Sequence, residues 1–204
     1  MDAQEWDERY AAAGRDALWA HAAPRILEEV VRPLTPGRAL DLGCGDGRST
    51  RLLLELGWEV TAVDFSAQAL AVARRLTTRG GDRVTWVHAD VLALPPATGA
   101  DLVLLAYLHL QVQDLRRVLA TAVASLAPGG TLLVLGHDLE NLRTGARGPT
   151  DPAVLYTPEL LAAAAAALRI VRCERVRRGA DDAETREGED RIAVDTLLVA
   201  TAQP

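Results

Sequence analysis

The chain has 204 residues, a length typical of a single domain that can bury an apolar core. Apolar residues make up 49% of it and charged residues 25%, a balance that argues against intrinsic disorder. The net charge is −6, all 22 basic residues are arginines, and no basic stretch stands out, so we expect no nucleic-acid partner.

The N-terminal stretch MDAQEWDERY is acidic and polar, whereas a signal peptide begins with basic and then apolar residues. No run approaches the ~20 apolar residues of a membrane span. We therefore expect a cytoplasmic protein without a membrane partner. The cysteines, Cys44 and Cys173, lie too far apart to indicate a disulfide scaffold or a metal site.

Short β-type runs alternate with helical patterns along most of the chain, which is typical of a parallel sheet. Capping side chains are expected at Ser49, Ser66, Asp114 and Thr157. The segment APGG at 127–130 should end a helix and turn the chain into the next strand. The expected strands are 39–42, 59–63, 84–88, 101–107 and 131–137, and the expected helices are 49–56, 67–76, 114–126 and 158–168.

Two alternating runs, 169–177 and 191–201, end the chain and are joined by a charged connection. This pattern favours an antiparallel pair at the end of the sheet. Such a pair offers either a free edge or an interface, so monomer and homodimer both stay open.

The stretch ALDLGCGDGR places Gly43, Gly45 and Gly47 directly after the first expected strand. Glycines let a ligand approach the main chain, and the following helix offers unpaired N–H groups. The spacing is GxGxG, not the GxGxxG of dinucleotide enzymes. We therefore expect a cofactor site here, and the spacing argues against NAD as its ligand.

Three acidic residues lie within or at the ends of the first three expected strands. Asp64 ends the second strand, where its carboxylate can accept from both hydroxyls of a ribose. Asp41 lies inside the first strand, where a carboxylate suits a cationic amine such as that of S-adenosylmethionine. Asp90 follows the third strand and can accept from an adenine amino group while Val91 packs on the ring.

The motifs DLGCGDG, VDFS, HADVLALP and SLAPGGTLLV resemble, in this order, those of the class I S-adenosylmethionine-dependent methyltransferases. WDERY and AYLHL resemble the TehB-like branch, which is related to thiopurine methyltransferases. The resemblance implies a three-layer α/β/α Rossmann-like fold whose seven-stranded, mostly parallel sheet has one antiparallel strand near its edge. It also implies a single domain over 1–204, with a helical lid at 1–36 and the core at 37–204.

The resemblance also assigns cofactor contacts residue by residue. Cys44 would be a small packing residue among them and not a nucleophile. The backbone of Ala106 and Tyr107 would border the methyl group. The full predicted cofactor set is Asp41, Gly43, Cys44, Gly45, Gly47, Asp64, Phe65, Asp90, Val91, Ala106 and Tyr107.

Methyl transfer from a sulfonium is an in-line displacement, so the protein mainly aligns the acceptor, which contributes roughly 7 to 11 kcal/mol. His109 and His137 follow the fourth and fifth strands and are the candidate bases, because an imidazole titrates near neutral pH. A structural role for His109 and a pocket-lining role for His137 and Asp138 stay open.

Residues 138–156 form a long connection that we interpret as the acceptor loop. Its Arg143 and Arg147 are either contacts for an anionic acceptor or ordinary surface arginines of a solvated loop. Trp6, Arg9, Tyr10 and Trp19 fit a lid that excludes water, or plain packing on the sheet. The predicted substrate set is Trp6, Tyr10, Tyr107, His109, His137, Asp138 and Tyr156.

These patterns predict methyl transfer from S-adenosylmethionine to a small molecule. An NAD-dependent oxidoreductase is the enzymatic alternative, although a chain without lysine lacks its common tyrosine–lysine relay. A protein that binds S-adenosylmethionine without transferring the methyl group is the second alternative.

Overall fold

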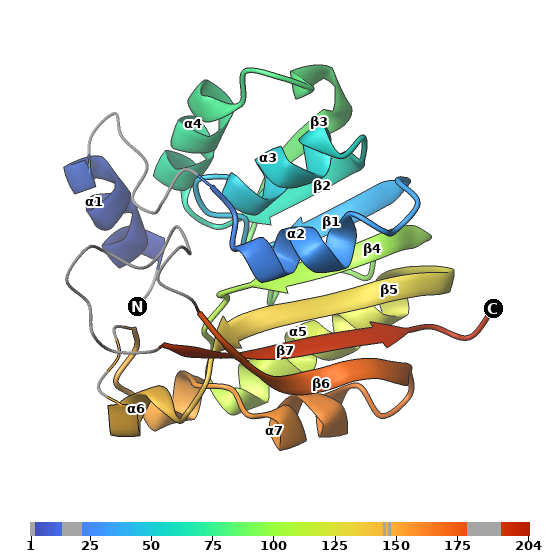
Figure 1. Ribbon diagram of the computed structural model, residues 1–204. Coiled ribbons are helices and arrows are strands. Elements are labelled where there is room, and N and C mark those ends of the chain that lie inside the picture. Colours follow the sequence, from blue (N-terminus) through green and yellow to red (C-terminus); the bar gives the residue numbers. More distant parts are fainter. Residues whose placement is uncertain (1–2, 14–21, 145, 147, 179–192) are drawn as a thin grey trace. The chain divides into compact units, whose positions relative to one another are not determined.

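A computed structural model describes residues 3–13, 22–144, 146, 148–178 and 193–204 (Figure 1). It contains two compact units, Met1–Leu94 and Pro95–Pro204, called the first and second unit below. The strands form a seven-stranded sheet in the order β3-β2-β1-β4-β5-β7-β6. β7 runs antiparallel to both of its neighbours. The predicted α/β fold, with an antiparallel strand next to the edge, is therefore confirmed.

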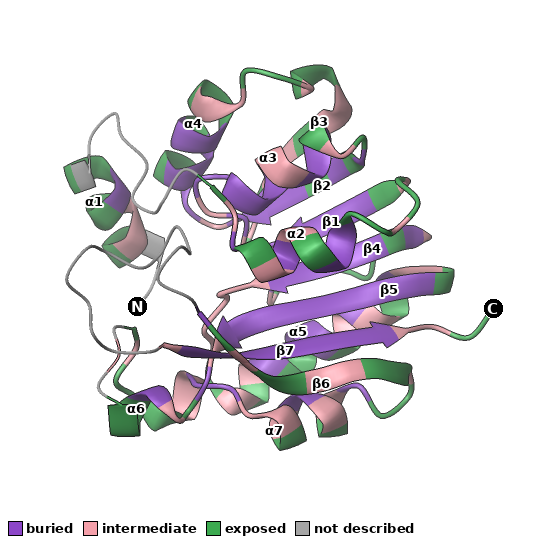
Figure 2. Cartoon of the chain, viewed as in Figure 1, coloured by how far each residue is buried: buried purple, intermediate pink, exposed green. Residues whose placement is uncertain are grey.

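In the first unit, β1 (Arg38–Leu42), β2 (Glu59–Asp64) and β3 (Val84–His88) pair in parallel. The helices α3 (Arg48–Glu55) and α4 (Ala67–Leu76) each pack against the two strands that they join. Their apolar side chains are buried together with those of β1 and β2 (Figure 2). The other helical elements are α1 (Ala3–Ala13), α2 (Arg25–Val31) and the 3-10 turn η1 (Gly81–Arg83).

In the second unit, β4 (Ala100–Ala106), β5 (Leu126–His137) and β7 (Val194–Thr201) carry the core, whereas β6 (Arg169–Arg177) is largely exposed (Figure 2). The helix α5 (Val112–Ser125) packs on β4 and β5, and α7 (Pro158–Ala164) packs on β6 and β7. Between β5 and α7 lie α6 (Asn141–Thr144) and the 3-10 turn η2 (Pro152–Val154). Arginines on the exposed edge strand discourage further strand pairing.

Two of the four predicted N-caps are confirmed. The hydroxyl of Ser66 accepts from the N–H of Ala69 at 3.0 Å, and that of Thr157 accepts from Leu160 at 3.2 Å. Both capping residues have an extended backbone, which is the conformation that lets an N-cap hydroxyl reach the N–H groups of the first turn.

The N-caps predicted at Ser49 and Asp114 are wrong. Helix α3 begins already after Gly47, whose left-handed backbone (φ 79°) ends the glycine turn. Helix α5 begins after Gln111, which leaves Asp114 inside the first turn, where its charge still complements the helix dipole. Helix α7 stops at Ala164, so the alanine run does not continue as helix despite its propensity.

The APGG segment lies inside β5, not ahead of it as predicted. Ala100 of β4 pairs with Leu126, and Leu102 pairs with Thr131, so the residues between them bulge out of the register. Gly129 supplies the expected left-handed residue (φ 75°) within this bulge. The left-handed glycine was therefore predicted correctly, but β5 begins before the APGG segment and not after it.

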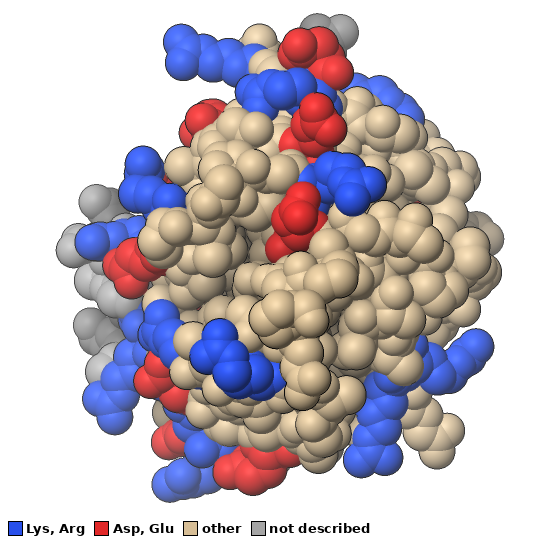
Figure 3. All heavy atoms as spheres, turned by 90° about the vertical axis from the view of Figure 1, so that its right-hand side faces the viewer, with Lys and Arg blue, Asp and Glu red and all other residues tan. Residues whose placement is uncertain are grey.

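Among the described residues, no helix has the length and apolar character that crossing a membrane requires. On the face drawn in Figure 3, arginines occur in small groups, several of them beside acidic side chains. Trp19, Arg147 and most of the charged connection before β7 lie outside the described residues.

Candidate active site

The glycine turn of the first unit joins β1 to α3 in a left-handed backbone conformation. Gly43, Gly45 and Gly47 have φ angles of 73°, 54° and 79°, which favour glycine. The N–H groups of Gly43 and Cys44 both donate to the carbonyl of Val63, at 2.9 and 3.0 Å, and so tie the turn to β2. A Cβ at Gly47 would lie 3.0 Å from both Trp86 and Ala73, so a side chain there would crowd these neighbours as well as strain the backbone.

Asp64 fixes this turn from the end of β2. Its Oδ2 accepts from the N–H of Gly45 at 2.8 Å, and its Oδ1 accepts from the N–H of Ser66 at 2.9 Å. Burial raises the pKa of this carboxyl, and the two backbone N–H groups oppose the rise. Each carboxylate oxygen has a second lone pair, so Asp64 can still accept from neighbouring hydroxyls of a ligand.

Asp41 is almost fully buried in β1 beside the turn. Its Oδ2 accepts from the hydroxyl of Thr50 at 2.6 Å. Burial, with a smaller contribution from the charge of Asp64, raises the pKa of Asp41 to about 6. A desolvated carboxylate of this kind gains most from a cationic partner. Thr50 was not predicted, because a threonine in the first turn of a helix has no distinguishing pattern.

The other predicted cofactor residues of the first unit lie close to the strand ends. Asp90 is exposed and accepts through Oδ1 from the N–H of Leu92 at 2.8 Å, while Val91 is buried. Phe65 is half-buried, and its carbonyl lies 2.9 Å from Nε2 of His88. Burial raises the pKa of the Cys44 thiol well above its ordinary value, so the thiol stays protonated and acts as packing.

Helix α1 brings an aromatic side chain onto the glycine turn. Asp7 accepts from the Ser66 hydroxyl at 2.5 Å and from the N–H of Gln68 at 3.2 Å, which attaches α1 to the start of α4. Tyr10 is buried, and a Cβ at Gly45 would lie 2.7 Å from its hydroxyl. The ring of Trp6 lies 5.9 Å from that of Tyr10. Asp7 was missed because nothing in WDERY distinguishes it from a surface acid.

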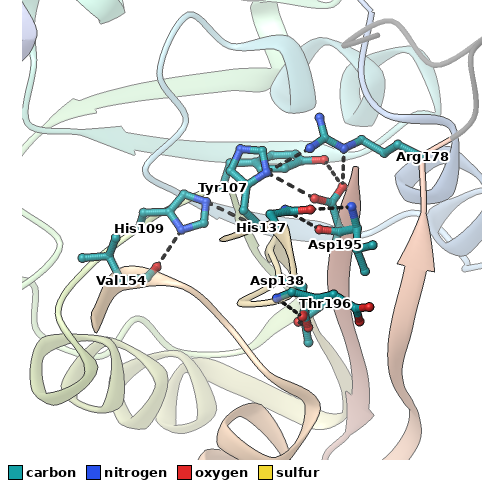
Figure 4. Close-up of polar contacts among 11 residues, drawn as sticks. Tyr107, His109, His137, Asp138, Val154, Arg178, Asp195 and Thr196 are labelled. Atoms are coloured by element: carbon teal, nitrogen blue, oxygen red, sulfur yellow. Dashed lines mark hydrogen bonds and ion pairs between the residues drawn. The ribbon is translucent and has the colours of Figure 1, made fainter. Parts of the chain in front are cut away.

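In the second unit, five side chains form what we call the His–Asp cluster: Tyr107, His109, His137, Arg178 and Asp195 (Figure 4). Tyr107 directly follows β4 and has a left-handed backbone (φ 58°). Its N–H donates to the carbonyl of Leu135 at 2.7 Å, and its hydroxyl donates to Oδ2 of Asp195 at 2.7 Å. An unusual backbone at such a position suggests a functional constraint.

His109 has both ring nitrogens engaged. Nδ1 lies 2.8 Å from the carbonyl of Val154 and therefore carries the proton, and Nε2 accepts from the N–H of His137 at 3.4 Å. Burial, helped by the neighbouring His137, lowers the pKa of His109 to about 4. A neutral ring held on both sides fits the structural alternative better than the predicted base role.

His137 and Asp195 face each other across the β5–β7 ladder, where they are direct partners in the register. The distance from Nδ1 of His137 to Oδ1 of Asp195 is 3.4 Å, and Arg178 places Nη2 at 3.0 Å from the same Nδ1. Burial works to raise the pKa of Asp195, but His137, Arg178 and Tyr107 outweigh it and hold that pKa low. The His137 side chain remains 14% exposed.

Asp138 and Tyr156 lie at the two ends of the predicted acceptor loop. Asp138 is fully buried, and its carboxylate accepts from Thr196 at 2.6 Å (Figure 4). It also accepts from Arg175 at 3.0 Å. Tyr156 is also fully buried, and its hydroxyl donates to the carbonyl of Leu108. These contacts fix the loop to the sheet, so direct binding of an acceptor by either side chain is not favoured.

Asp195 and Arg178 were not predicted. Asp195 lies 88 residues from Tyr107 in sequence, so no local motif connects them. The available signal was an acid within the apolar run AVDTLLVA of the last strand, because a carboxylate on a buried strand needs a partner. The predicted cofactor contacts at Ala106 and Tyr107 belong to the second unit and stay predictions.

Comparisons with known proteins agree with this architecture. Residues 39–130 match the family model of a methyltransferase domain. The chain is 37% identical over 130 residues to a demethylmenaquinone methyltransferase of Thermus thermophilus, and the match covers 62% of this chain and 57% of that protein. The chain thus matches less than two thirds of that relative's length.

Solved structures share the fold. The N-methyltransferase NodS of Bradyrhizobium japonicum, in complex with S-adenosyl-L-homocysteine, matches with a TM-score of 0.74 and 19% identity over 99% of this chain and 98% of that one. TehB of Haemophilus influenzae matches with a TM-score of 0.71 and 16% identity over 88% of this chain and 62% of that one. Structures at these identities establish the fold, and TehB is one neighbour among several.

Proposed function

We propose that this protein transfers the methyl group of S-adenosylmethionine to a small-molecule acceptor. The observation that carries the proposal is the pair of buried carboxylates, Asp41 and Asp64, that flank the left-handed glycine turn. The methyltransferase-domain match over residues 39–130 includes both of them.

The residues of the first unit fit the parts of this cofactor. Asp41 would hold the cationic amine, the bare backbone at Gly43 and Gly45 would admit the methionine chain, and Asp64 would accept from the ribose hydroxyls. Asp90 and Val91 would border the adenine. When bound, S-adenosylmethionine supplies an activated methyl group, so the protein has to align the acceptor and not to activate the donor.

The second unit would serve the acceptor. The His–Asp cluster offers a partly exposed imidazole, and residues 138–156 would form the acceptor loop. A neighbour in the solved structures, the 1,6-didemethyltoxoflavin-N1-methyltransferase of Burkholderia thailandensis, has 1,6-didemethyltoxoflavin and S-adenosylhomocysteine bound, which supports a small-molecule acceptor here. We also propose a place in the TehB-like branch, on the WDERY and AYLHL motifs, and a monomer or homodimer that needs neither nucleic acid nor a membrane.

Titration calorimetry of the purified chain with S-adenosylhomocysteine, and with NADH in parallel, tests the proposal. We expect a stoichiometric complex with S-adenosylhomocysteine and no heat from NADH. Binding of NADH alone would replace the proposal with the oxidoreductase alternative. Binding of S-adenosylhomocysteine without methylation of any member of a panel of thiols, phenols, amines and carboxylates would favour a binding protein without transfer.

A further inference from the structure

Helix α1 of the first unit buries little apolar surface. Among the side chains that the structure describes in α1, Tyr10 is buried, Trp6 and Asp7 are half-buried, and the others are exposed. A helix of 11 residues is only marginally stable in water by itself. Segments with few buried apolar contacts are also those that open most easily from a folded protein. The position of α1 therefore depends on a small number of specific contacts.

Asp7 attaches α1 to the first turn of α4, beside which α1 lies (Figure 1). Its Oδ1 accepts from the hydroxyl of Ser66 at 2.5 Å and from the N–H of Gln68 at 3.2 Å. A carboxylate at this end of a helix also meets the positive end of the helix dipole. Hydrogen bonds to a charged acceptor are about twice as strong as neutral ones. We call these two contacts the Asp7 latch.

The Asp7 latch lies next to the acid that is proposed to bind the ribose. Ser66 donates through its hydroxyl to Asp7, and through its N–H to Oδ1 of Asp64 at 2.9 Å. Burial is the main cause of the raised pKa of Asp64, and the charge of Asp7 adds to it. The two carboxylates are therefore close enough to interact.

Tyr10 lies three residues after Asp7, on the same face of α1, and reaches the glycine turn. It is buried, and a Cβ at Gly45 would lie 2.7 Å from its hydroxyl. The N–H of Gly45 donates to Oδ2 of Asp64 at 2.8 Å. One face of α1 thus meets both sides of the Asp64 carboxylate, through Ser66 and through Gly45. A ligand that extends from Asp64 to the backbone of Gly45 would lie against this face.

We infer that Asp7 is a positioning residue of the cofactor site: the Asp7 latch keeps Tyr10 on the glycine turn, and its opening admits and releases the cofactor. The identity of the cofactor rests on the proposed function, whereas the latch does not. Tyr10, predicted from the sequence as an acceptor contact, is assigned to the methionine part of the cofactor instead. The product S-adenosylhomocysteine leaves only after the contacts of Asp7 have broken.

Hydrogen exchange of the chain without cofactor tests the latch. Because a detached α1 would be largely unfolded, the exchange rate of amides 7–12 reports on its docking. We expect Asp7→Ala to raise this rate by about tenfold or more, because it removes charge-assisted hydrogen bonds. The control is Glu8→Ala, which removes an exposed acid bonded to Gln4 and should leave the rate unchanged. The amides of α4 should stay protected, because Ser66 still caps that helix.

The dissociation rate of S-adenosylhomocysteine, measured by stopped-flow displacement, tests the control of cofactor exchange. We expect Asp7→Ala to raise this rate by about tenfold and Glu8→Ala to leave it unchanged. Since Asp7 acts through Tyr10, the double variant Asp7→Ala with Tyr10→Ala should dissociate no faster than Tyr10→Ala alone. Asp7→Asn keeps an acceptor oxygen but loses the charge, so its rate should lie between those of wild type and Asp7→Ala.

Unchanged exchange of amides 7–12 in Asp7→Ala, or a rise confined to α4, would overturn the latch. Effects of Asp7→Ala and Tyr10→Ala that multiply in the double variant would overturn the positioning role, because Asp7 would then act independently of Tyr10. If Asp7→Ala does not fold, Asp7→Asn provides the same tests with a smaller expected change. Absent binding of S-adenosylhomocysteine would remove the proposed function, while hydrogen exchange would still decide whether Asp7 holds α1.

Discussion

The two candidate sites are built from different parts of the chain. In the first unit, left-handed glycines and backbone N–H groups shape the site, and Asp64 is held by main-chain donors. In the second unit, side chains from the ends of β4, β5 and β7 make the site by contacting one another. A site made of backbone has a contiguous sequence signature, whereas a site made of side chains depends on strand register.

The largest expected effect is on the rate of methyl transfer, and it distinguishes the acceptor site from the cofactor site. His137→Gln should lower the rate of methyl transfer by about 10²–10⁴-fold, because it removes the proton acceptor and leaves the first unit intact. Single-turnover assays with an acceptor from the panel measure the rate, and calorimetry measures S-adenosylhomocysteine affinity. Arg172→Gln, at an exposed position of β6, is the control and should transfer normally. A parallel loss of cofactor affinity in His137→Gln would make His137 structural.

Lowering the pH should change the free energy of unfolding in opposite directions through Asp41 of the first unit and His109 of the second. The pKa of Asp41 is raised to about 6, so its ionisation costs stability at neutral pH, and that cost disappears as the pH falls toward the ordinary value of 3.8. The pKa of His109 is lowered to about 4, so the fold loses stability as the pH falls from 6.5 to that value. Each effect amounts to roughly 3 kcal/mol.

Urea unfolding between acidic and neutral pH checks this contrast in Asp41→Asn and His109→Gln. The stability of Asp41→Asn relative to the wild type should decrease as the pH falls, because the wild type is then relieved of its buried charge. The stability of His109→Gln relative to the wild type should increase over the same range. Parallel curves for wild type and variant would show that the group does not titrate as described.

Asp64→Ala tests the backbone-built site directly. It removes charge-assisted hydrogen bonds worth roughly 1.5 to 3 kcal/mol each, so affinity for S-adenosylhomocysteine should fall by about tenfold or more. Calorimetry provides the measurement, and Asp82→Ala, an exposed acid of the same unit, is the control. Unchanged affinity in Asp64→Ala would remove this residue from the site.

The smallest expected effect concerns stability. Gly47→Ala places a side chain on a left-handed backbone and at 3.0 Å from Trp86, and should cost about 1 to 3 kcal/mol. Gly81→Ala meets no atom within 4 Å and should be nearly neutral. Thermal unfolding of the two variants gives the comparison. Equal midpoints would mean that the glycine turn tolerates a side chain.

The same contrast explains which features the sequence could predict. Short β-type runs between helical patterns located the first five strands, and two alternating runs located the last two. The hydroxyls of Ser66 and Thr157 marked helix starts that are confirmed. The starts of α3 and α5 were misplaced because the preceding backbone, not a capping side chain, begins each helix. The bulge at 127–130 depends on the pairing of β4 with β5, which no local pattern contains.

In the sites, Asp41, Asp64 and the glycines were found because their chemistry is local to strand ends. Asp195 was missed because its partnership with His137 follows from the register of β5 with β7. Thr50 and Asp7 were missed because a threonine in the first turn of a helix and an acid in WDERY have no distinguishing local pattern. His109 was identified as a site residue, but its double hydrogen bonding could be seen only in three dimensions.

The left-handed backbone of Tyr107 bears on any attempt to engineer this chain for heat resistance. A tyrosine holds that conformation at a cost of order 1–3 kcal/mol, which a glycine would largely avoid. A glycine would also delete the hydroxyl that donates to Asp195. Replacing the tyrosine would therefore have two opposed effects on the melting temperature, because glycine relieves the backbone strain but leaves an oxygen of the buried Asp195 carboxylate without its donor. A search for heat-resistant variants should therefore leave position 107 unchanged.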